Sequence, residues 1–513
     1  MSDNPDMTEA PSPTPAMSVR GAAIWAMASQ YLAFALQFAS SVLISRFFLT
    51  PAEVGLFSIA MAAALLVAVL QDFGLSRYIS GLPRLEHAEI ERCSSIALLF
   101  SLLVAGVVMA LAWPLARLYA MPDLAPLLVV IGSSYFFLPL AIVPLALMAR
   151  DMQFRGHFAV NVGGACAQAG VALGLAAAGY SSFALAWATV ASGLARGTIA
   201  QILRPALPRR LHLTGSGAVF AFGTRSSALY VSGALGTRSP DMVVGKLLSL
   251  SAVGLYSRAV SLSDQFQMLI SGAIGSVLYP AFARIRDRGE ALGPAYLRVC
   301  AGYSAIVWPG MTGLSLAALP IVRMLYGESW LGVAPLLSLV AFNATLHIAL
   351  PMVSEVPILL GRMNRLLAYN VIDTALSIGL LALGCLWGVE GAAASRLVYG
   401  VLWLALYFGF MHRLVGFAVS DWLKLYAKSL AGTLAALAPL TLAYLFWHGP
   451  QTITFGPLLA CVLTGVLCWL LALLLVRHPV LGEFYGMARG IRLPVLQRAI
   501  APETRLGALL EKM

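Results

Sequence analysis

Charged residues are scarce in this chain. Only 11% of its 513 residues are Asp, Glu, Lys or Arg, whereas 60% are hydrophobic and the mean hydropathy is +0.85. A water-soluble fold cannot bury so large an apolar share, so a soluble globular domain is excluded. The sequence therefore predicts an all-α, polytopic membrane protein.

Motifs of several catalytic classes are also missing. The chain contains no GxxxxGK[ST] phosphate-binding loop, which excludes ATP hydrolysis by this chain. It contains no HExxH motif, and its 6 cysteines show no CxxC spacing, so we expect neither a metal site nor a disulfide framework. The connections between apolar runs are too short for a soluble catalytic domain. We expect no cofactor and no enzymatic activity.

Cations are almost absent from every second loop. Most of the 33 Lys and Arg residues lie in the other loops, at the N-terminus or in the C-terminal tail, as Arg150, Arg155 and Arg284 do. By the positive-inside rule, this asymmetry predicts that both termini are cytoplasmic. The net charge of +11 then reflects topology, and we expect membrane lipids rather than nucleic acid as partners of the basic patches.

Long apolar runs count as membrane spans, because a helix needs about 20 apolar residues to cross the bilayer. The chain has about fourteen such runs. Residues 1–17, before them, are acidic and rich in Pro, which predicts a disordered cytoplasmic tail. Residues 477–513, after them, predict a basic cytoplasmic tail.

A long internal repeat organises the spans. The sequence VLISRFFLTPAEVGLFSIA at residues 42–60 returns as MVVGKLLSLSAVGLYSRA at residues 242–259. Residues 114–128 and 320–337 form a second matching pair, in which Pro, Arg and Tyr are followed by Ala-Pro-Leu-Leu. A period of about 200 residues fits a duplicated helix bundle rather than a solenoid.

The repeat sets the predicted domain organisation. We expect an N-terminal six-helix lobe at residues 18–210 and a C-terminal six-helix lobe at residues 211–420. Residues 421–476 have no counterpart in the first half and predict two additional transmembrane helices. Each repeat has an even number of spans, so the two copies share one orientation in the membrane.

Charged side chains inside spans are candidates for function, because a charge in lipid costs roughly 2.5–3.5 kcal/mol even on a lenient scale. Four cations lie inside spans: Arg196, Arg225, Arg258 and Arg396. The candidate substrate-binding residues are Arg46, Arg225, Lys246, Arg258, Arg396, Gln30 and Gln37. The candidate ion-coupling residues are Asp264, Glu355 and Asp373, since a carboxyl group in a low dielectric can carry a proton. Snorkelling at span ends and structural ion pairs are the alternatives.

Five segments of the chain resemble a known family, the polysaccharide flippases of the multidrug/oligosaccharidyl-lipid/polysaccharide exporter superfamily. The resemblance is carried by LTPAEVGLFS, QDFGL, DMVVGKLL, GLYSRA and VLYPAFAR, at residues 49–58, 71–75, 241–248, 254–259 and 277–284. GLYSRA and PAFAR look most like the exopolysaccharide branch of the colanic acid type. The chain departs from the usual pattern at Leu248-Ser249-Leu250, where relatives often have a Leu-Gly-Pro turn.

The resemblance implies two six-helix lobes around a central cavity and a function in exopolysaccharide or lipopolysaccharide biosynthesis. Such a protein would flip undecaprenyl-pyrophosphate-linked oligosaccharide from the cytoplasmic to the periplasmic leaflet of the bacterial inner membrane, by ion-coupled alternating access. A polysaccharide polymerase and export machinery would be its protein partners. A drug or cation exporter, a peptidoglycan-precursor flippase and a membrane glycan ligase stay open as alternatives.

Overall fold

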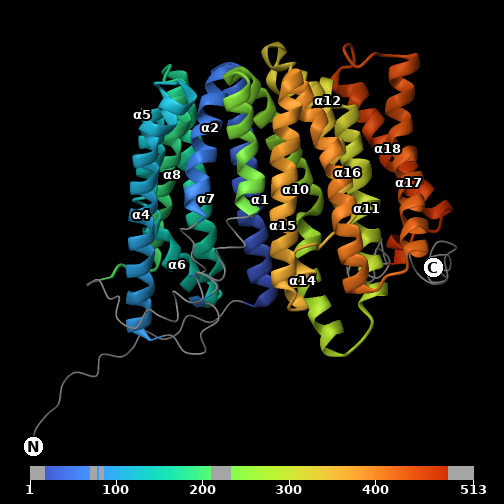
Figure 1. Cartoon of the computed structure of the whole chain (residues 1–513), viewed down its shortest axis with the longest axis horizontal. Coiled ribbons are helices and arrows are strands. Elements are labelled where there is room, and N and C mark those ends of the chain that lie inside the picture. Colours follow the sequence, from blue (N-terminus) through green and yellow to red (C-terminus); the bar gives the residue numbers. More distant parts are fainter. Residues whose placement is uncertain (1–17, 70–74, 76–77, 80–85, 209–232, 483–513) are drawn as a thin grey trace, which may run out of the picture. The chain divides into compact units, whose positions relative to one another are not determined.

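The computed structural model describes residues 18–69, 75, 78–79, 86–208 and 233–482 (Figure 1). Every element assigned within these residues is helical, which confirms the predicted fold class. The chain divides into two compact units, Met1–Leu49 with Leu56–Ala234 and Thr50–Gly55 with Leu235–Met513. The lobe boundaries inferred from the repeat stay a prediction.

The first unit is a bundle of helices, most of which run in a similar direction (Figure 1). Its helices are α1 (Val19–Phe47), α2 (Pro51–Ala68), α4 (His87–Tyr119), α5 (Leu124–Ser134), α6 (Pro139–Arg150), α7 (Phe154–Ala177) and α8 (Ser182–Leu203). Its core includes Leu75, Ile79, Ile96, Val143 and Leu147, all of which are buried.

The second unit begins, within the described residues, with the first turn of α2 and continues from Leu235. Its elements are α10 (Leu250–Asp287), α11 (Leu292–Leu316), α12 (Ala318–Tyr326), η1 (Glu328–Trp330), α13 (Val333–Ile348), α14 (Glu355–Leu359), α15 (Met363–Gly384), η2 (Cys385–Trp387), α16 (Gly388–Val415), α17 (Val419–Phe446) and α18 (Phe455–Leu475). α17 packs on α11 and α18 packs on α17, and a cluster that includes Ala317, Leu440 and Leu458 joins these elements.

Seven stretches in the described residues are long and apolar enough to cross a membrane, or up to nine if each bent pair of helices is one span. One of the seven, Met363–Val415, contains both α15 and α16. The bent pairs are α5 with α6, at 41°, and α11 with α12, at 70°. The chain is thus a multi-pass membrane protein, and the count of about fourteen spans stays a prediction.

The short polar break in each copy of the repeat is the start of a helix. In the first copy, the Thr50 N–H donates to Glu53 Oε2 at 2.7 Å and the Glu53 N–H donates to Thr50 Oγ1 at 3.4 Å, which is a capping box. In the second copy, Ser249 Oγ accepts from the Ala252 N–H at 3.2 Å. Both copies therefore satisfy the free amides of a new helix with a hydroxyl side chain.

The glycines of the repeated Val-Gly-Leu motif pack against each other's helices. A Cβ atom on Gly55 would overlap the carbonyl oxygen of Leu250, and one on Gly254 would overlap the carbonyl oxygen of Pro51. Pro51 and Leu250 each precede their glycine by four residues, so the contact is reciprocal. It brings two backbones closer than any side chain permits.

An arginine near the end of a helix in each unit donates to a backbone carbonyl of another segment. In the first unit, Arg150 Nη1 donates to the Ile79 carbonyl at 2.6 Å, and Arg204 pairs with Asp151 at 2.7 Å. In the second, Arg286 Nη1 donates to the Leu359 carbonyl at 2.8 Å. Cations that the sequence assigns to topology therefore also bind backbone carbonyls and a carboxylate.

A buried histidine follows α18. His478 Nδ1 accepts from the Val480 N–H at 3.2 Å, and its Nε2 lies 3.0 Å from Ser429 Oγ. Ser429 Oγ lies in turn 2.8 Å from Ser304 Oγ, which extends the polar chain from α17 to α11. Burial, reinforced by the nearby Lys428 charge, lowers the pKa of His478 to about 4. The ring is therefore neutral in the folded protein at pH 7.

We expect acid to destabilise the protein through His478. Its pKa is about 6.5 when unfolded and about 4 when folded, so the unfolded state takes up the proton first as the pH falls. Stability is then complete above pH 6.5 and falls between pH 6.5 and 4, by about 3 kcal/mol. Thermal melting in detergent at pH 7.5 and pH 5 measures the loss.

In this measurement, His478→Gln should flatten the pH dependence of Tm, because an amide keeps hydrogen-bonding capacity without titrating. His448→Gln is the matched control, since His448 stacks on Trp447 outside this polar chain. An unchanged pH dependence in His478→Gln would contradict the assignment.

Candidate functional site

Polar side chains on α15 and α16 meet within the second unit. Tyr399 Oη donates to Asp373 Oδ1 at 2.8 Å, and Arg396 Nη1 donates to Ser377 Oγ at 2.7 Å. The Arg396 guanidinium carbon lies 4.4 Å from the centre of the Tyr399 ring. Among the described residues, Arg396 forms no ion pair within 4.0 Å, so its positive charge is not neutralised by direct contact with Asp373.

Aromatic side chains of α13 and α16 pack beside this cluster. The His347 ring on α13 lies 4.6 Å from the Trp403 ring and 5.5 Å from the Tyr399 ring. Tyr407 Oη donates to Asn370 Oδ1 at 2.8 Å. Tyr399, Trp403 and Tyr407 recur every four residues along α16 and are all buried. This row is packed core that sets the rotation of α16, and with it the direction of Arg396.

A second acidic group belongs to the same unit. The Asp264 side chain on α10 is exposed. The charges of Arg238 and Arg396 both act on its carboxyl group. Asp241 is not among the residues predicted from the sequence. Its carboxyl group accepts a hydrogen bond from the Ser257 hydroxyl at 3.5 Å, and the charge of Arg238 also acts on it. The second unit thus carries a set of carboxylates and guanidinium groups within its apolar helices.

Arg258 lies in an aromatic setting. Its guanidinium carbon is 5.6 Å from the ring centres of both Tyr326 and Trp330, two buried residues at the end of α12 and in η1. Asp264 lies six residues further along α10, about 9 Å along the helix axis. The two rings hold the cation by cation–π attraction.

The other predicted site residues are not among the contacts described above. Arg46 and Lys246 are exposed in equivalent places of the repeat, just before the caps at Thr50 and Ser249. Gln30 and Gln37 are exposed on α1, and Glu355 is exposed as the first residue of α14. Arg225 lies outside the described residues.

The first unit holds a polar cluster of which the sequence indicated only one member, Arg196. Asn161 Nδ2 lies 2.9 Å from His157 Nδ1 and donates to Ser29 Oγ at 3.4 Å. The Arg196 side chain on α8 crosses α7 directly over Gly164, where a Cβ atom would overlap it. Its Nε is buried and, within the described residues, has no hydrogen-bond partner. The spacing of His157 and Asn161, one helical turn apart, is the signal that could have revealed the cluster.

No group of three or more His, Cys, Asp or Glu residues in the described part of the chain could hold a metal ion, and the six cysteines are free thiols. The chemistry that the polar residues themselves offer is binding of ions: guanidinium groups can bind an anion, and carboxylates can bind a cation or a proton.

The family described as "Polysaccharide biosynthesis protein" matches residues 43–335, which is more than half of the chain. The chain belongs to this family. It is 26% identical to the "Succinoglycan biosynthesis transport protein ExoT" of Rhizobium meliloti over 74% of this chain and 76% of that protein. It is 23% identical to the "Lipopolysaccharide biosynthesis protein WzxC" of Escherichia coli over 65% of this chain and 68% of that protein.

Solved structures share the fold of this family member. The "Lipid II flippase MurJ" in an inward closed conformation aligns with a TM-score of 0.66, covering 88% of this chain and 97% of that one at 15% identity. An inward-facing multidrug resistance MATE family transporter aligns with a TM-score of 0.59, covering 77% and 98% at 14% identity. The prediction of a transporter rather than an enzyme is confirmed by the family and its named relatives.

Proposed function

We propose that this chain is a flippase that moves undecaprenyl-pyrophosphate-linked oligosaccharide from the cytoplasmic to the periplasmic leaflet of a bacterial inner membrane. Membership of the polysaccharide biosynthesis family, with relatives named for succinoglycan transport and lipopolysaccharide biosynthesis, is the observation that carries the proposal. In the predicted topology both termini are cytoplasmic.

The free-energy barrier to moving an oligosaccharide through bare lipid is large. An oligosaccharide with about ten hydroxyl groups, each costing about 1–3 kcal/mol to bury unpaired, meets a barrier of tens of kcal/mol in bare lipid. A protein lowers this barrier by offering hydrogen-bonding and charged groups inside the membrane. The second unit has such groups in Asp264, Asp373, Arg238 and Arg396.

Arg396 is our leading choice for the pyrophosphate. A guanidinium group stays charged when partly dehydrated and can bind two phosphate oxygens at once. Within the described residues, Arg396 is held by a neutral hydroxyl and an aromatic ring instead of a carboxylate, so a ligand phosphate would not have to displace a salt bridge there. Arg258, between two aromatic rings, and the exposed pair Arg46 and Lys246 are further candidates.

Coupling to an ion gradient is assigned to Asp373, Asp264 and Glu355. Asp373 accepts a hydrogen bond from Tyr399, next to Arg396, so a change in its protonation would alter the local charge where we place the phosphate. One charge crossing with the membrane potential supplies about 2.3 kcal/mol per 100 mV. That is enough to bias the direction of flipping.

We expect Arg396→Gln to reduce flipping at least tenfold. The measurement reconstitutes the protein in vesicles, loads lipid-linked oligosaccharide into one leaflet and follows access of a lectin or glycosidase from the other side. Glutamine keeps a hydrogen bond to Ser377 but removes the charge. Arg396→Lys should recover part of the rate, because an ammonium keeps the charge but not the bidentate geometry.

The control is Arg413→Gln, an exposed arginine near the end of the same helix. It should flip glycolipid at the wild-type rate. If glycolipid never becomes accessible to the lectin from the opposite side of wild-type vesicles, the proposed function is wrong. If Arg396→Gln flips glycolipid as fast as Arg413→Gln, the proposed function stands and only the role of Arg396 is wrong.

A further inference from the structure

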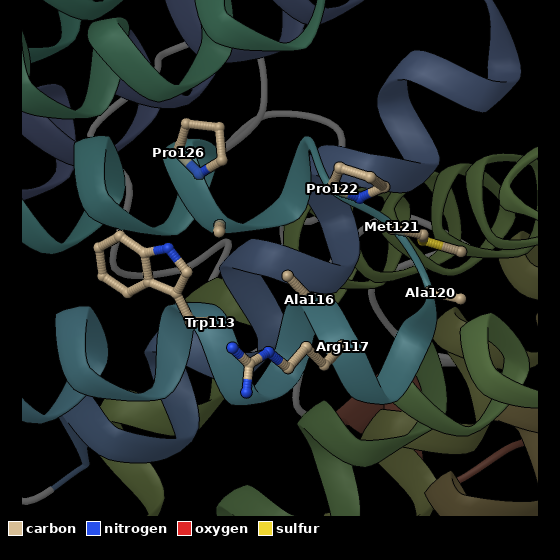
Figure 2. A pocket seen from close by; sticks show the side chains of 8 residues that line it. Trp113, Ala116, Arg117, Ala120, Met121, Pro122 and Pro126 are labelled. Carbon is tan, nitrogen blue, oxygen red and sulfur yellow. The ribbon is translucent and has the colours of Figure 1, made fainter.

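A shallow hollow of about 520 Å³ lies where α4 ends and α5 begins, away from the polar cluster of the first unit. Figure 2 shows Trp113 and Arg117 on α4, with Pro122 and Pro126 across the hollow from them. Trp113 is 58% exposed. The lining contains one cation and no acidic side chain.

One face of α4 is built to meet lipid tails. Leu99, Leu103, Val107 and Leu111 recur every four residues along it and are all exposed. Trp113, Arg117 and Leu118 continue this exposed face toward the end of the helix. The helix has 33 residues and is about 50 Å long, so it exceeds the hydrocarbon core of about 30 Å. A helix longer than the hydrocarbon core reaches the head-group region, and we place the hollow at the end of α4 there.

Arg117 lacks, within the described residues, a partner that its counterpart in the repeat has. Arg323, the equivalent residue in the second half, pairs with Glu328 at 2.9 Å and donates to the Gln451 carbonyl. In the described part of the chain, the Arg117 guanidinium has no hydrogen bond or ion pair of its own. In the predicted topology it is also a cation on the periplasmic side, where cations are rare. Among the described residues, then, no side chain supplies the counter-charge of Arg117.

We propose that this hollow binds the head group of an anionic glycerophospholipid, of the phosphatidylglycerol type, in the leaflet that surrounds the C-terminal end of α4. Arg117 donates two N–H groups to the phosphate oxygens, and Trp113 packs its indole against the glycerol and the first acyl carbons. The volume is within the range of about 300–1,000 Å³ that small ligands occupy.

The charge of the lining sets the lipid preference. A zwitterionic head group brings an ammonium that finds no carboxylate in the hollow and is repelled by Arg117. An anionic head group of the phosphatidylglycerol type has no ammonium and brings only a negative charge, which pairs with the Arg117 guanidinium. The site is independent of flipping, and its occupation would anchor the depth of α4 and α5 in the bilayer.

The test is a lipid titration of the full-length protein in neutral detergent. Dioleoyl-phosphatidylglycerol or dioleoyl-phosphatidylethanolamine is added, and retained lipid is counted by native mass spectrometry. We expect the wild type to retain phosphatidylglycerol at least fivefold better. Arg117→Gln should lose this preference, Arg117→Lys should keep part of it, and Trp113→Leu should weaken retention of both lipids.

Matched controls are Arg413→Gln and Trp187→Leu, which change an exposed arginine and an exposed tryptophan outside the hollow. Both should behave as the wild type. Equal retention of the two lipids by the wild type, or full preference in Arg117→Gln, would overturn the proposal. Inorganic phosphate at matched concentration should not displace phosphatidylglycerol; if it does, the hollow is an anion site and not a lipid site.

Discussion

Gly254→Val should leave little folded protein. The branched side chain would meet the Pro51 carbonyl on α2, which is backbone and cannot rotate away. We expect a destabilisation of about 3 kcal/mol or more and a fall in Tm of about 10 °C in detergent. Gly55→Val should do the same through the Leu250 carbonyl. Fluorescence-detected size-exclusion chromatography after heating measures both.

Gly302→Val is the control for volume and helix propensity, because nothing lies within 4 Å of a Cβ at Gly302 on α11. It should melt close to the wild type. A Gly254→Val protein as stable as Gly302→Val would contradict the close approach of the two helices.

The two glycines should also be coupled to each other. Gly55→Ala and Gly254→Ala each force α2 and α10 apart at the same contact, and one displacement relieves both clashes. The double variant should therefore cost less than the sum of the single variants, by about 0.5–3 kcal/mol. Strict additivity would show that the two positions are independent.

Asp373→Asn should uncouple glycolipid movement from the ion gradient. An asparagine oxygen still accepts the hydrogen bond from Tyr399, so the geometry of the cluster is kept while the titratable group is lost. At 100 mV, the wild type should accumulate glycolipid in the far leaflet about fifty-fold for each charge moved, whereas the variant should approach equal distribution.

The measurement compares leaflet distributions in vesicles with an imposed potential and with the potential collapsed. Asp421→Asn is the control, since Asp421 is exposed in the first turn of α17 and pairs there with Lys424 at 3.8 Å. It should accumulate glycolipid as the wild type does. Accumulation by Asp373→Asn at the wild-type level would exclude Asp373 from coupling and leave Asp264 and Glu355 as the candidates.

The candidate sites were partly accessible from sequence. A charge inside an apolar run is visible without coordinates, which is why Arg196, Arg258, Arg396 and Asp373 could be named. Their partners could not. Tyr399 bonds to Asp373 from the next helix, and Gly164 makes room for Arg196 from the preceding one. Such pairings depend on how each helix is rotated about its axis, and apolar runs without a strong periodicity do not fix that rotation.

The sequence by itself determined the membrane location, the helical class and the duplication, because these follow from apolar length, scarce charge and repeated letters. It also marked the polar breaks that cap the helices at Thr50 and Ser249. Only the tertiary structure decided that Gly55 and Gly254 meet backbone to backbone, and that Arg323 donates to the Gln451 carbonyl whereas Arg117, within the described residues, has no such partner. The physical reason is range: caps and spans are set by neighbours along the chain, whereas these contacts require helices distant in sequence to pack.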